Sequence, residues 1–97
     1  KYTYSNSNYI ILSYIIEKAS GQSFENYLQE HILKPLGMHD SGLENLSLII
    51  PNRTTGYVRN DTHIKNAPYL DFSWAVGSGG MYSTIEDMYR WDRALYA

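Results

Sequence analysis

The chain has 97 residues, a length at which one domain with one hydrophobic core is the usual outcome. Hydrophobic residues make up 43% of it and charged residues 19%, which excludes the class of intrinsically disordered chains. A net charge of -2 without a basic run argues against a nucleic-acid partner, and no apolar stretch is long enough to span a bilayer.

The first predicted element is a helix over residues 7–19. From Tyr9 to Ile16 only Ser13 is neither aliphatic nor aromatic, and such a run alone does not distinguish a helix from a strand. Residues 5–7 offer an N-cap, and Gly21 supplies a stop signal, so the flanks decide for a helix. Because it is apolar on nearly every side, we expect this helix to be surrounded by more protein.

A second helix is predicted to start after Ser23, which can cap it, and to end before Pro35, because proline disfavours the helical conformation of the residue before it. Its apolar positions recur at helical spacing: Phe24, Tyr27, Leu28 and Ile32. Residues 40–80 then contain seven proline and glycine residues and one short strand candidate, near residues 55–59. A loop of this length is expected to be functional and to pack against a site.

The last helix is predicted from a capping box at residues 83–86, in which Ser83 and Glu86 satisfy each other's free backbone amides. Asp87, in its first turn, is explained by the helix dipole, and we assign it no catalytic role. The apolar stripe of this helix is typical of an ordinary amphipathic helix and consists of Ile85, Met88, Trp91 and Leu95.

Metal and cofactor chemistry is not indicated. The chain has no cysteine, so thiolate ligands and nucleophiles are excluded. The three histidines, His31, His39 and His63, stand at irregular spacings without a metal-binding helix pattern. We therefore expect neither a metal nor a cofactor.

Four motifs in a fixed order carry a family resemblance. They are the triplet Tyr4-Ser5-Asn6, Gly-Gln-Ser at residues 21–23, Pro-Leu-Gly-Met at residues 35–38, and Gly-Gly-Met-Tyr-Ser-Thr-Ile-Glu-Asp-Met at residues 79–88. Across essentially the whole chain, this order resembles class C β-lactamases and related penicillin-binding proteins, D-aminopeptidases and esterases.

The resemblance implies a mainly α chain, the helical sub-domain of the β-lactamase/transpeptidase-like α/β fold. Residues 1–97 are expected to form one unit with three main helices, a long omega-like loop and at most short strands. Family catalysis uses a Ser-x-x-Lys helix, a Tyr-x-Asn element and a Lys-Thr-Gly or His-x-Gly strand. Only the second motif occurs here, so we expect the nucleophile, its lysine and the third motif to lie outside these residues, in an α/β lobe that is the partner of this one.

Site residues follow from the same resemblance. It implies that Tyr4 transfers protons, which requires a nearby cation because free tyrosine has a pKa of about 10. It also implies that Asn6 faces the substrate, although an N-cap role is equally expected from the sequence. Gly77, Gly79 and Gly80 would let the backbone approach a substrate, with plain turn formation as the alternative. Trp74 and Tyr82 either line the same pocket or serve packing.

The leading hypothesis is therefore the helical part of a serine acyl hydrolase that acts on β-lactams, D-alanyl peptides or small esters. The alternative is a non-catalytic module of the same fold that binds cell-wall peptide or a protein. An independent enzyme is disfavoured, because no complete nucleophile and base pair can be assembled from these residues. The habit of the family is a bacterial protein that works outside the cytoplasm.

Overall fold

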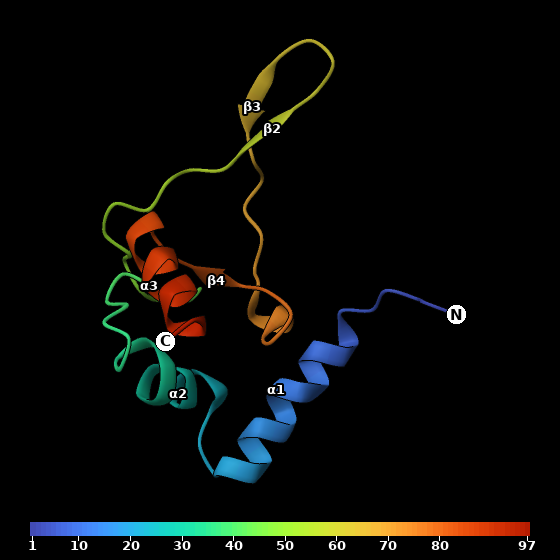
Figure 1. The fold of residues 1–97 in the computed structure, drawn as a ribbon. Helices are drawn as coiled ribbons and strands as arrows, with labels where there is room; N and C mark the ends of the chain where they lie inside the picture. The colour runs from blue at the N-terminus through green and yellow to red at the C-terminus, as the bar shows by residue number, and fades with distance from the viewer.

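The computed structural model describes residues 1–97, and helices provide most of its regular structure, as predicted. The helical elements are α1 (Ser7–Ser20), α2 (Phe24–Leu28), a π-helical turn η1 (Gln29–Leu33), a 3₁₀ turn η2 (Ser73–Ala75) and α3 (Ile85–Leu95). Figure 1 shows α1 running away from the N-terminal segment, with α2 and α3 on the other side of the molecule. No helix has the length and hydrophobicity that crossing a membrane requires.

Four short strands form two separate antiparallel pairs. They are β1 (Gly42–Leu43) with β4 (Met81–Tyr82), and β2 (Tyr57–Arg59) with β3 (Ile64–Asn66). The strand predicted near residues 55–59 is confirmed as β2, whereas the other three were not predicted. The β2–β3 hairpin extends away from the helices, while β4 lies beside α3 (Figure 1).

Helix α1 has the predicted extent within one residue. Gly21 ends it in the left-handed region (φ 72°), and the Gly21 N–H donates to the Glu17 carbonyl at 3.0 Å. Of its side chains only Ser13 is buried, whereas the apolar ones on the remaining faces are half exposed, at 51 to 58% for Tyr9, Ile11, Leu12, Tyr14 and Ile15. Nothing within these 97 residues surrounds this helix.

The second helix starts as predicted, because the Ser23 side chain accepts from the Asn26 N–H. It then widens into η1, where Lys34 N–H donates to the Gln29 carbonyl, five residues back. Pro35 follows directly, and its ring would clash with a carbonyl four residues earlier in a regular α-helix. Gly37 (φ 70°) closes the turn, with the Met38 N–H bonded to the Leu33 carbonyl.

The small hydrophobic core lies under this second helix. It consists of Leu28, Leu33 and Met38, with Phe24, Ile32, Leu36 and Leu43 packed against them. In total only 8 of 97 residues are buried, so the chain builds one local cluster and not the extensive core of a self-contained domain.

Helix α3 corrects one prediction. The N-cap is Thr84, whose hydroxyl accepts from the Asp87 N–H at 3.2 Å, so the predicted capping box with Ser83 as N-cap is wrong by one residue. Ser83 instead forms a hydrogen bond with Ser41, at 2.7 Å between their hydroxyl oxygens. Two neighbouring residues that both can cap a helix are not distinguished by spacing, and here a tertiary contact makes the choice.

Candidate active site

The Tyr-x-Asn element stands at the start of α1. The Tyr4 phenol donates to Asn6 Oδ1 at 3.0 Å, and both side chains are exposed. Asn6 occupies the N-cap position, but its side chain makes no capping hydrogen bond, so the N-cap role expected for it is wrong. Because the phenol holds only Oδ1, the two N–H groups of the Asn6 amide are directed to no protein acceptor and remain available to a ligand.

Gly79 and Gly80 form a corner between η2 and β4. The Gly80 carbonyl accepts from the Glu44 N–H at 2.7 Å, which ties the corner to the end of β1. Gly80 has φ 74°, and a Cβ there would meet Phe72 at 3.2 Å, so this position requires glycine. A Cβ on Gly79 would meet nothing within 4 Å, which leaves open space beside its backbone.

Both glycines line a cavity of about 310 Å³, a size suited to a small acyl group. Its other walls come from α2, from β1 and the residues after it, and from η2 and the residues on either side of it. They consist of Glu25, Leu43, Glu44, Asn45, Leu46, Leu70, Asp71, Phe72, Ser73 and Val76. Trp74 and Tyr82 do not line it. Trp74 is 65% exposed, and the Tyr82 ring lies against Gly42 on the paired strand, so Tyr82 serves packing.

Two of the three carboxylates at this cavity are already engaged. Glu44 pairs with Arg53 at 2.7 Å. Hydrogen bonds from the backbone and side chain of Ser73 hold the pKa of Asp71 below its usual value, against a weaker opposing effect of burial. Asp71 is therefore not a candidate for a neutral acid near neutral pH. No group of three or more histidine and carboxylate side chains is arranged to hold a metal ion.

The loop that carries the two glycines rests on α1. The Ser13 hydroxyl lies 2.7 Å from the Ile10 carbonyl oxygen and 3.1 Å from the Val76 carbonyl oxygen, and these two acceptors share its one proton. Gly77 (φ 89°) follows, and its Cα lies so close to the helix that a Cβ would meet Ser13 Cβ at 2.7 Å. Helix α1, which directly follows Tyr4 and Asn6, is thus in contact with the loop that ends at Gly79 and Gly80.

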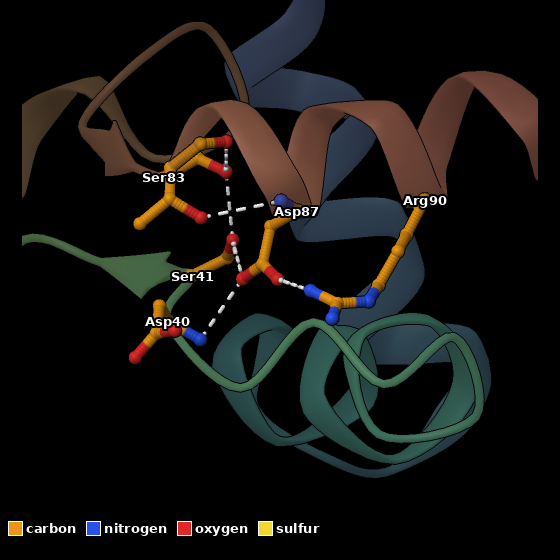
Figure 2. Close-up of polar contacts among 6 residues, drawn as sticks. Asp40, Ser41, Ser83, Asp87 and Arg90 are labelled. Atoms are coloured by element: carbon orange, nitrogen blue, oxygen red, sulfur yellow. Dashed lines mark hydrogen bonds and ion pairs between the residues drawn. The ribbon is translucent and has the colours of Figure 1, made fainter.

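A buried carboxylate on α3 holds the segment that leads into β1, and sequence reasoning missed it. Figure 2 shows the Asp87 side chain pointing from α3 toward Asp40 and Ser41. Its Oδ2 accepts from Asp40 N–H at 2.9 Å and from Ser41 Oγ at 2.7 Å, while Arg90 donates to Oδ1 at 2.6 Å. Asp87 has no exposed surface, which a helix-dipole role does not require.

Asp87 is an anion despite its burial. Burial raises the pKa of its carboxyl, but hydrogen bonds from Ser41, the Asp40 N–H and Arg90, with the charge of Arg90, outweigh burial and leave the pKa below its usual value. The only sequence signal for this role is an acidic residue three positions after a helix-capping threonine, a pattern that normally indicates a cap alone.

Known proteins are similar to this chain in sequence. The family model described as Beta-lactamase matches residues 1–96. The chain is 32% identical to penicillin-binding protein 4* of Bacillus subtilis, over 96% of the chain and 23% of that protein. It is 30% identical to the D-aminopeptidase of Gluconobacter oxydans, over 97% of the chain and 18% of that protein.

One solved structure extends the comparison to the fold. The octameric penicillin-binding protein homologue from Pyrococcus abyssi superposes with a TM-score of 0.78 at 28% identity, over 96% of this chain and 21% of that one. The chain therefore spans less than a quarter of the length of each of these three relatives.

Proposed function

Because the chain belongs to the beta-lactamase family of penicillin-binding-protein-like serine hydrolases, we propose that it supplies the Tyr-x-Asn half of an acyl-hydrolase active site. The observation that carries the proposal is the hydrogen bond between the Tyr4 phenol and Asn6 Oδ1 at the exposed start of α1. On this proposal the serine nucleophile, its lysine and the third motif come from an α/β lobe outside residues 1–97.

In the proposed reaction, Tyr4 takes the proton of the serine as the serine oxygen forms the acyl-ester bond, and passes it to the leaving group. A phenol acts as a base near neutral pH only when a neighbouring cation stabilises its anion, and the motif lysine supplies that charge. The free N–H groups of Asn6 donate to the acylamide carbonyl of the substrate. Water then cleaves the ester and restores the serine.

The surface of the chain supports a covering lobe. A self-contained protein of 11.2 kDa has an accessible surface of about 5,700 Å², whereas this chain exposes 8062 Å². Its radius of gyration is 15.7 Å, against about 12.5 Å for a compact domain of this length. The excess is partly apolar and includes the half-exposed faces of α1, which is the surface that a permanently attached lobe buries.

The substrates on this proposal are β-lactams, D-alanyl peptides or small esters. All three present a carbonyl carbon with an acyl side chain on one side and a leaving nitrogen or oxygen on the other. The cavity beside Gly79 and Gly80 has room for the acyl side chain. Two relatives, one named a penicillin-binding protein and the other a D-aminopeptidase, support this choice.

The test is Tyr4→Phe in the intact protein, with Tyr2→Phe as the matched control, because Tyr2 is an exposed tyrosine of the same segment without a hydrogen bond. Acylation by a fluorescent penicillin and turnover of ester substrates are measured. We expect Tyr4→Phe to lower the rate of acylation by about 100-fold or more, since general acid–base catalysis contributes about 10²–10⁴-fold, and Tyr2→Phe to leave it unchanged. Equal rates in both variants would refute the proposed role and favour a binding module.

A further inference from the structure

Ser13 is an exception within α1 that packing alone does not explain. It is the one polar residue of the run from Tyr9 to Ile16, and it is the only buried residue of the helix, at 6% exposure. A larger apolar residue at this position would bury more surface. The structure gives the reason for a small hydroxyl residue, because its Oγ lies 3.1 Å from the Val76 carbonyl. Val76 belongs to residues 75–80, the glycine loop.

Gly77 is the counterpart of Ser13 on the loop. A Cβ there would meet Ser13 Cβ at 2.7 Å and the Tyr9 carbonyl at still closer range. Carbon atoms settle at about 3.5–4.0 Å from one another, so any side chain at Gly77 moves the loop by about 1 Å. Gly37 has nearly the same backbone angle (φ 70°) but nothing within 4 Å of its Cβ position. The contact therefore distinguishes Gly77 from a glycine that only forms a turn.

The glycine loop transmits such a displacement because it is internally braced. The N–H groups of Ser78 and Gly79 both donate to the Ala75 carbonyl at 2.9 Å, and the Ser78 hydroxyl donates to the same oxygen. Ala75 is buried. On the other side, Ser13 lies seven residues after Asn6, about 10 Å along a rigid helix. The segment with Tyr4 and Asn6 and the corner at residues 79–80 are thus joined through the contact of Ser13 with the glycine loop.

We propose that Ser13 and Gly77 are positioning residues that set the separation between the Tyr4 and Asn6 side chains, just before α1, and the Gly79–Gly80 corner. That separation decides which acyl side chains fit between the proton-transferring phenol and the cavity wall. The inference rests on the proposed function, since it names the device by which that same site selects its substrate. Neither residue touches the substrate, and both act through the elements that do.

The experiment compares Gly77→Ala with Gly37→Ala in the intact protein. The substrates are p-nitrophenyl acetate and p-nitrophenyl phenylacetate, which share a leaving group and differ in the acyl side chain, and two penicillins with the same two acyl groups. The readout is the ratio of kcat/KM between the small and the large acyl group. Loss of folded protein lowers kcat for every substrate by one factor and leaves KM and this ratio unchanged, so a purely structural effect does not move the readout.

We expect Gly77→Ala to change the ratio by about tenfold or more with a change in KM, because a misplacement of about 1 Å can cost about 10²-fold in rate, and Gly37→Ala to leave it unchanged. If Gly77→Ala does not fold, Ser13→Ala is measured against Ser20→Ala. Removal of the Ser13 hydroxyl is expected to change the ratio in the same direction by a smaller factor.

Two negative outcomes are distinguishable. If Tyr4→Phe abolishes acylation but Gly77→Ala and Ser13→Ala keep the ratio of the wild type, the positioning role is overturned and the proposed function stands. If the wild-type protein is not acylated by penicillin and hydrolyses neither the esters nor a D-alanyl peptide, both proposals are overturned together.

Discussion

Replacement of Asp87 by Asn tests whether the buried carboxylate, and not only the cap of α3, holds the β1–β4 pair in place. The change keeps the shape and removes the charge that Asp40 N–H, Ser41 Oγ and Arg90 share. A hydrogen bond to a charged group contributes about 1.5–3 kcal/mol and a neutral one about 1 kcal/mol. Since Arg90 is half exposed, its share is small. We expect the free energy of unfolding to fall by about 3 kcal/mol for the network as a whole.

The assay is urea unfolding of the intact protein, followed by tryptophan fluorescence, because Trp91 lies one turn from Asp87 on the same helix. Asp92→Asn is the control, since it removes an exposed carboxylate without a hydrogen bond from the same helix. Equal unfolding free energies for Asp87→Asn and Asp92→Asn at pH 7 would refute the reasoning.

A pH series sharpens the same test. The pKa of Asp87 is lower in the folded protein than in the unfolded chain, so its contribution is complete above the unfolded value of about 4 and disappears as the pH falls through the folded value. The wild type is therefore expected to lose more stability than Asp87→Asn between pH 5 and the acid limit of about 2. If both proteins lose the same amount, the carboxylate of Asp87 is not the group responsible.

Four further outcomes are expected. Tyr4→Phe slows acylation while Tyr2→Phe does not, as measured with fluorescent penicillin. Gly77→Ala changes the ratio of kcat/KM between small and large acyl groups. Residues 1–97 alone, incubated with a reactive penicillin, show no adduct by intact-mass spectrometry, and a stoichiometric adduct would mean that they contain a nucleophile. The same isolated chain binds a hydrophobic dye and self-associates, and Leu12→Gln on α1 lowers both; a monodisperse chain without dye binding would contradict the exposed apolar surface.

The helices were predictable because their signals are local. An apolar run with a glycine stop placed α1, and Ser23 with Pro35 bounded the second helix, in each case within a few residues along the chain. The widening of the second helix into η1 was missed, since the spacing of apolar residues does not distinguish an α-helix from a π-helix over one turn.

The remaining features depend on contacts between distant residues. Strands β1 and β4 have two residues each and form only because Gly42 meets Tyr82 and Leu43 meets Met81. Asp87 acquires its role from Ser41, 46 positions away. Ser13 was noticed as an interruption of an apolar run, but its purpose is visible only with Val76, 63 positions away. No spacing rule along the chain encodes these pairs, so local reasoning assigns each residue its commonest role.

The exposure of Tyr4 connects the surface argument to the chemistry. A phenol that is 72% exposed is surrounded by water, and water screens any cation placed beside it. Proton transfer by such a group becomes effective when the site closes and excludes water, because electrostatic interactions strengthen in a low dielectric. On the proposed architecture, one lobe packed against α1 buries its apolar side chains and dries the start of the same helix. Burial of α1 and activation of Tyr4 are then one event, so a substitution that loosens the packing of the lobe on α1 should slow acylation even when every motif residue is intact.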